Sequence, residues 1–139
     1  MKRMLLTGLL LLPLAGRAET TLFEDLGGRE AISAFTTRLV GHLKSDGRIS
    51  PFFAESDMDR LHDRLTDYFC HVAGEKRSYR GANLYYAHKG LGIHERDFDA
   101  LAEDLEDSMD EAGVPYSAQA RLLALLALLA PLERSIVND

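Results

Sequence analysis

The sequence has a single cysteine, Cys70, among its 139 residues. One cysteine cannot form an intramolecular disulfide, so the fold depends for its stability on an apolar core or on a bound ligand. The five histidines show no His-Glu-x-x-His spacing, and one thiol supplies a tetrahedral zinc site poorly. The chain also has no nucleophile elbow and no glycine-rich phosphate loop. These absences argue against zinc enzymes, serine hydrolases and nucleotide-binding proteins.

Basic residues are also few, because 16 lysines and arginines face 22 aspartates and glutamates. Nucleic-acid binding needs clustered lysine and arginine that displace the counterions of the phosphate backbone. A chain with a formal charge of −6 lacks such a surface. We therefore expect no nucleic-acid partner.

No apolar run is long enough to span a bilayer, which takes about 20 residues. The longest run extends from Met4 to Gly16, follows Lys2 and Arg3, and ends in Gly16-Arg17-Ala18. A basic head, a short apolar centre and small residues before Glu19 predict a signal peptide that is cleaved near Ala18. An N-terminal anchor or an irregular start is the alternative.

On this prediction residues 1–18 are removed, and residues 19–139 form one globular domain in the periplasm or outside the cell. Loss of Lys2, Arg3 and Arg17 changes the formal charge from −6 to −9. We expect the mature chain to be a monomer or weak dimer without membrane insertion.

No segment alternates apolar and polar residues over more than four positions, so the expected fold class is all-α. Apolar residues at helical spacing predict a helix over residues 29–43, followed by a tight corner at residues 49–53. A second helix is expected from a hydroxyl cap at Ser56 to about Gly74. A third runs over residues 94–113, and a leucine-rich last helix starts near Tyr116 and is central to the core.

His88 lies at the end of a short apolar segment and has glycines on both sides, at positions 81, 90 and 92. A histidine in such a place is expected to be accessible to a ligand rather than packed in the core. A capping or surface histidine is the alternative. A noncovalent haem needs one imidazole, apolar walls and cations at its rim. The sequence offers these wall candidates and rim cations: Phe52, Phe53, Phe69, Leu84, Tyr86, Ile93, Phe98, Arg64, Lys76 and Arg77.

A set of short segments follows an ordered pattern along the chain: residues 22–28, Pro51-Phe52-Phe53, Asp57-Met58, Tyr79-Arg80-Gly81, residues 87–93, Gly113-Val114-Pro115, Ala130-Pro131-Leu132 and Ile136-Val137. In order and spacing these segments resemble those of the group I truncated haemoglobins. The resemblance implies a two-over-two helical sandwich that encloses haem b and binds a diatomic gas. The absence of Cys-x-x-Cys-His excludes covalent attachment of the c type.

Residue by residue, the resemblance makes His88 the proximal iron ligand and Phe53 the phenylalanine that stacks on the haem. Phe98 is an aromatic below the haem, Arg64 a basic position that reaches a propionate, and Tyr79 a tyrosine near the haem edge. The remaining residues expected to contact the cofactor are Phe69, Leu84, Ile93, Leu61, Leu65 and Val40.

On the side of the haem where the gas would bind, the sequence departs from the family's pattern. The usual tyrosine of the first long helix falls on Val40, the supporting glutamine falls on Leu65, and the gate position is Leu61. Without these donors, we expect weak retention of oxygen. The alternative is that His62, on the flank of the helix that carries Leu61 and Leu65, becomes a sixth ligand of the iron.

The expected function is reversible binding of oxygen, with nitric oxide and carbon monoxide as further ligands. An electron donor, nitric-oxide dioxygenation and peroxidase-like turnover remain open, but the predicted gas-binding face has no acid-base group, which disfavours an enzyme. The alternatives are an exported helical interaction domain without haem and a haem redox or sensor protein.

Overall fold

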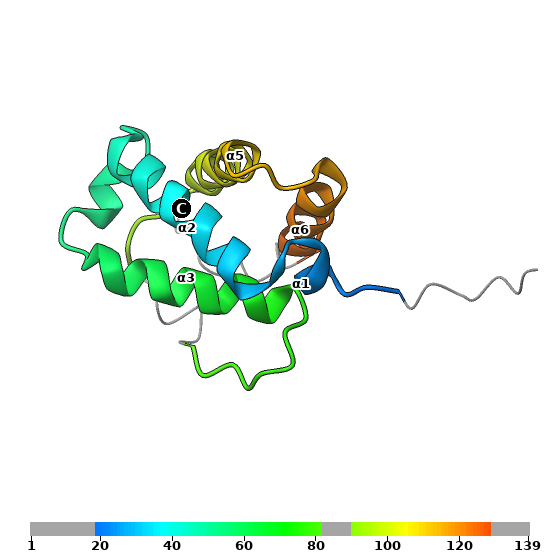
Figure 1. Cartoon of the computed structure of the whole chain (residues 1–139). Helices are drawn as coiled ribbons and strands as arrows, with labels where there is room; N and C mark the ends of the chain where they lie inside the picture. Colours follow the sequence, from blue (N-terminus) through cyan, green and yellow to red (C-terminus); the bar gives the residue numbers. More distant parts are fainter. Residues whose placement is uncertain (1–18, 82–89, 129–139) are drawn as a thin grey trace, which may run out of the picture.

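The computed structural model describes residues 19–81 and 90–128. Within these ranges the chain is helical and has no strand, which confirms the all-α fold class (Figure 1). The signal-peptide prediction, the predictions for Leu84, Tyr86 and His88, and the segments from residue 129 onward lie outside the described residues. The helices are α1 (Leu22–Asp25), α2 (Gly28–Ser45), the 3-10 helix η1 (Ser50–Phe53), α3 (Met58–Val72), α5 (Glu95–Glu111) and α6 (Tyr116–Leu128).

Helix α2 is the central helix of the fold, because it packs against both α3 and α5 (Figure 1). Its apolar residues recur at helical spacing and form one buried stripe. The ring of Phe35 on this stripe is fully buried and lies 5.9 Å, centroid to centroid, from the ring of Phe69 on α3. Such aromatic pairs add to the burial of apolar area, so this contact fixes how α3 lies on α2.

The N-cap of helix α3 lies one residue later than predicted. Asp57, not Ser56, is the N-cap, and its carboxylate accepts hydrogen bonds from the backbone N–H groups of Asp59 and Arg60 at 3.1 and 3.2 Å. A carboxylate also interacts favourably with the positive end of the helix dipole, which a serine hydroxyl does not match. The prediction of Ser56 as the cap was therefore wrong.

The short helix α1 is tied to the far end of α3. The backbone N–H of Phe23 donates a hydrogen bond of 2.9 Å to the carbonyl oxygen of Ala73. Between α1 and α2 the chain turns at Gly27, whose φ is +98°. A Cβ there would lie 2.7 Å from the Cβ of Ala31, so both backbone angle and space require glycine.

A buried carboxyl group joins the end of α2 to α5. Asp104 is 5% exposed, and its Oδ2 has no hydrogen-bond partner among the described residues. Burial, followed by the neighbouring carboxyl of Asp46, raises the pKa of Asp104 to about 6, while hydrogen bonds from Arg48 hold the pKa of Asp46 well below its usual range. A protonated Asp104 therefore lies beside an ionised Asp46 in weakly acidic solution.

Helix α6 places one face in the core. Ala118 and Leu122 are buried, whereas Leu128 at its end is 75% exposed. No helix in the described ranges is both long and apolar enough to span a membrane.

Candidate functional site

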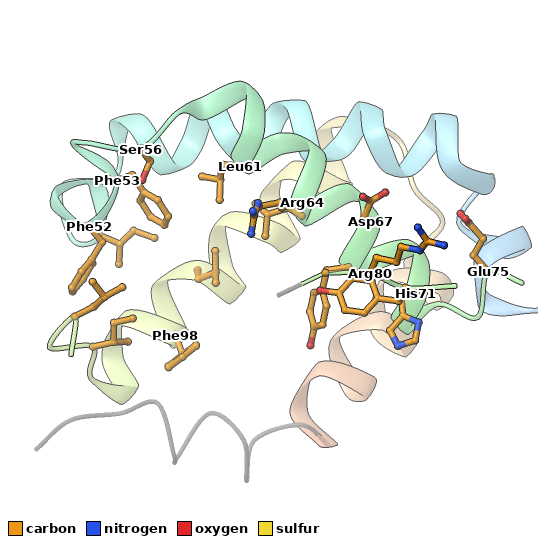
Figure 2. A pocket seen from close by; sticks show the side chains of 18 of the residues that line it. Phe52, Phe53, Ser56, Leu61, Arg64, Asp67, His71, Glu75, Arg80 and Phe98 are labelled. Atoms are coloured by element: carbon orange, nitrogen blue, oxygen red, sulfur yellow. The ribbon is translucent and has the colours of Figure 1, made fainter. Parts of the chain in front are cut away.

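A cavity of about 890 Å³ opens between α3 and α5 and is bounded by η1 and the loop before residue 82. Its two ends differ in chemistry (Figure 2). Phe52, Phe53 and Phe98 lie at one end, and Asp67, His71 and Glu75 lie at the other (Figure 2). Leu61 and Arg64 lie between them, on α3 (Figure 2). The cavity therefore combines an aromatic slot with a charged mouth.

Most of the sequence-predicted contact residues line this one cavity. They come from η1, α3, the loop before residue 82, the segment before α5 and the first turns of α5, and they are Phe53, Leu61, Arg64, Leu65, Tyr79, Ile93 and Phe98. Phe69 and Val40 do not line it, because Phe69 packs against Phe35 and Val40 is buried on α2. Leu84 and His88 lie outside the described residues.

Four arginines line the cavity, and they differ in how they are paired. Arg29 binds the carboxylates of Asp67 and Glu75, at 2.6 and 2.9 Å. Arg77 lies 4.0 Å from Glu75. In the part of the chain that the structure describes, no carboxylate lies within ion-pair distance of Arg64 or Arg80, so both guanidinium groups are available to an anionic ligand. Lys76, a predicted rim cation, does not line the cavity.

The charged mouth includes an aromatic pair. The rings of His71 and Tyr79 stack, with centroids 4.6 Å apart and planes at 14°. Burial raises the pKa of the Tyr79 hydroxyl, so the phenol stays neutral. A Cβ at Gly81 would overlap the Tyr79 ring, so glycine at this position lets the loop pass beside it.

Sequence reasoning missed several residues of the mouth. His71 and Tyr68 line the cavity from α3, and Arg80 lines it from the loop. A signal for the first two exists, because Arg64, Tyr68 and His71 are spaced i, i+4, i+7 and so share one face of a helix. Arg80 lies between two residues of a matching segment but was not assigned a role.

His62 faces α2 rather than the cavity. Its Nε2 lies 3.1 Å from the carbonyl oxygen of Ser33 and 3.2 Å from the hydroxyl of Thr37, and its Nδ1 lies 3.1 Å from the carboxylate of Asp63. It lines a separate small pocket between α2 and α3. Both ring nitrogens therefore have partners outside the main cavity.

Comparison with known proteins identifies the family. The bacterial-like globin family matches residues 21–135. The chain belongs to this family. The group 1 truncated haemoglobin of Tetrahymena pyriformis is 34% identical to this globin over 94 residues, which cover 68% of this chain and 78% of that protein. A group 1 truncated haemoglobin of Synechocystis is 32% identical over 124 residues, 86% and 99% of the two chains.

Solved structures show the same arrangement of helices. The truncated haemoglobin of Tetrahymena pyriformis in its Fe(III) form superposes with a TM-score of 0.79 at 27% identity, covering 86% of this chain and 100% of that one. The 2/2 haemoglobin of a Synechococcus species reaches 0.78 at 22% identity with the same coverage. The two-over-two sandwich and the group I resemblance are therefore confirmed, and the chain is a haem-binding globin for gas ligands.

The cavity of this globin fits a haem. Its volume of about 890 Å³ lies in the range of cofactor sites, about 300 to 1,000 Å³. A haem combines an apolar ring with two carboxylates, and the cavity combines aromatic walls with guanidinium groups that have no carboxylate partner in the described part of the chain. When bound, haem supplies an iron atom that takes up a gas molecule.

Proposed function

We propose that this globin holds a noncovalent haem b through His88 and binds oxygen reversibly on the side lined by Leu61 and Leu65. The observation that carries the proposal is that seven residues assigned to a haem pocket from the sequence line one cavity, although they come from separate segments. Chance burial would scatter such a set over the core.

In this proposal the chain's own residues have distinct roles. His88 provides a neutral imidazole, and Phe53, Ile93 and Phe98 supply the apolar walls. Arg64, on α3, offers a guanidinium to one propionate, since arginine pairs with carboxylates through two parallel hydrogen bonds. Tyr79 closes the edge of the site.

The gas-binding side is apolar in this proposal. Leu61 and Leu65 line the cavity and carry no hydrogen-bond donor, and His62 is held on α2. A pocket without a donor binds oxygen weakly and discriminates little against carbon monoxide. Neither Leu61 nor Leu65 supplies an acid or base for turnover, so we propose reversible binding of oxygen, nitric oxide or carbon monoxide rather than an enzyme.

We further propose that the globin is exported and acts in the periplasm or outside the cell. The basic head, the short apolar run and the small residues before Glu19 support this proposal. Residues 19–139 would be the mature chain.

The test is the absorption spectrum of protein made with haem supplied. Wild type should show a Soret band, and His88→Ala should lose or weaken it. His94→Ala is the matched control, because His94 lies six positions away and is an exposed N-cap of α5. A colourless wild type would contradict haem binding and favour a helical interaction domain. A band that survives in His88→Ala would assign the iron to another ligand.

A further inference from the structure

The carboxylate of Glu75 links the loop at the charged mouth to helix α2. Glu75 is 13% exposed and accepts hydrogen bonds from Arg29 at two points, Nε to Oε2 at 3.1 Å and Nη2 to Oε1 at 2.9 Å. Arg29 belongs to the first turn of α2, and Glu75 follows the end of α3. The pair thus joins residues 46 positions apart in a bidentate geometry that fixes orientation as well as distance.

The same guanidinium also contacts α3. Its Nη1 donates a hydrogen bond of 2.6 Å to Asp67, whose side chain is 55% exposed. Arg29 therefore has one partner on a helix and one on the loop. Loss of either carboxylate leaves the arginine held by the other.

The loop that follows Glu75 forms part of the mouth of the cavity. Arg77 N–H donates to the carbonyl oxygen of Glu75 at 2.8 Å, and Tyr79 then stacks on His71. Between Glu75 and Gly81 the structure assigns no regular helix. Glu75 attaches the loop to α2 through its ion pair and to α3 through its backbone N–H, which donates to the carbonyl oxygen of Cys70 at 3.0 Å. The Tyr79 stack is a second attachment to α3.

We propose that the bidentate Arg29–Glu75 pair is a positioning device that holds Tyr79 and Arg80 at the mouth and so sets how slowly this globin releases its haem. This inference rests on the proposed function, because it takes the cavity as the haem site. In this proposal Arg29 and Glu75 affect haem release indirectly, by holding the loop in position.

The test compares two variants that remove one negative charge each from the same arginine. Glu75→Gln removes the loop's ion pair with α2 and leaves Arg29 on Asp67, whereas Asp67→Asn keeps the ion pair of the loop. Each haem-loaded protein is mixed with excess apomyoglobin, and the rate of haem transfer is followed by absorbance. Glu75→Gln should release haem about tenfold faster than wild type, a change of about 1.4 kcal/mol, and Asp67→Asn should stay within about twofold.

A simple charge effect gives the opposite result. Removing either carboxylate makes the mouth less negative, which should strengthen the hold on two propionates and slow haem loss in both variants. Slower or unchanged release from Glu75→Gln would overturn the proposal. Equal acceleration in both variants would also overturn it, because it would point to general loosening.

A second readout does not depend on haem transfer. The loop contains Lys76, Arg77 and Arg80, each a site for trypsin. Limited digestion of the three purified proteins should cut Glu75→Gln in this loop several times faster than wild type or Asp67→Asn. Equal cutting in all three proteins would contradict a role in holding the loop. If wild type shows no Soret band, the proposed function fails, and the digestion still tests the Arg29–Glu75 attachment.

Discussion

The ring of Tyr79 lies flat against the imidazole of His71, with 4.6 Å between centroids. The two residues come from different segments, since His71 is in the last turn of α3 and Tyr79 is in the loop that follows. The stack closes the loop back onto the helix that it has just left. The stack therefore holds the loop in place at the mouth of the cavity.

Replacement of Tyr79 should separate the effect of the ring from that of its hydroxyl. Tyr79→Ala removes the stack and part of a half-buried side chain, so we expect the free energy of unfolding to fall by about 1 kcal/mol. Tyr79→Phe keeps the ring and should stay near wild type. Urea denaturation followed by circular dichroism measures both. Equal losses in the two variants would mean that the hydroxyl, not the stack, stabilises the loop.

A donor added to the gas-binding side should slow the release of oxygen. Leu65→Gln places an amide where Leu65 lines the cavity. A hydrogen bond to a partly charged group contributes about 1.5 to 3 kcal/mol, which corresponds to a decrease of about tenfold or more in the oxygen dissociation rate. Leu65→Met has similar length without a donor and should match wild type. Stopped-flow kinetics decides, and slow release already present in wild type would reveal a hydrogen-bond donor other than Leu61 and Leu65 in the site.

His62→Ala should affect stability and leave the spectrum unchanged. The imidazole is bonded to Ser33 and Thr37 on α2, and loss of these bonds should lower the free energy of unfolding by about 1 kcal/mol. The spectrum of the reduced, ligand-free protein should be the same in wild type and variant. A six-coordinate, low-spin spectrum that becomes five-coordinate in His62→Ala would show instead that the histidine reaches the iron.

Asp104 should make the fold less stable as the pH rises from about 4 to about 6. Because burial raises its pKa from 3.8 to about 6, the folded state keeps a proton that the unfolded state has lost. Asp46 acts in the opposite direction, since its lowered pKa makes its contribution disappear as the pH falls below about 4. Arg48 lies 3.8 Å from Asp104 and also pairs with Glu103 at 2.6 Å, and His42 has a weaker interaction with Asp104.

Asp104→Asn removes this titration. The amide stays neutral and can donate to Asp46, so the free energy of unfolding at pH 7 should rise by about 1 to 2 kcal/mol and its decrease between pH 4 and 6 should disappear. Thermal and urea denaturation across this pH range provide the measurement, with Glu103→Gln as a control on the exposed side of α5. A variant that is destabilised at pH 7 would indicate an ionised Asp104 bound to Arg48.

Export predicts a shortened chain. Mass spectrometry of protein from a periplasmic fraction should give an N-terminus near Glu19, because signal peptidase cuts after small residues such as Ala18. Protein that keeps Met1 and stays in the cytosol would contradict export while leaving the haem proposal untouched.

The helices could be predicted closely from apolar spacing alone. The helix expected over residues 29–43 is α2 at Gly28–Ser45, and the helix expected from Tyr116 is α6. Long stripes of buried residues leave little choice of element. The cap at Ser56 was wrong because two adjacent residues could both cap, and the choice depends on where the first turn begins.

The site was less predictable because it depends on which way α3 is rotated. At about 100° per residue from Leu61, the cavity side runs from Leu65 round to His71, so it extends past Arg64. Phe69 lies about 80° from Leu61, on the side away from Arg64, and its ring packs there against Phe35 on α2. Hydrophobicity alone cannot distinguish a face that packs on a helix from one that lines a cavity.

The hydrogen bond from Phe23 to Ala73 also bears on the order in which the molecule is built. It closes a loop of chain that contains α2, η1 and α3, the segments that emerge first during synthesis. Phe35 and Phe69 both lie within this loop, so their contact needs nothing from α5 or α6. We expect this N-terminal part to assemble early, so that one wall of the cavity is complete before the opposite wall has been made.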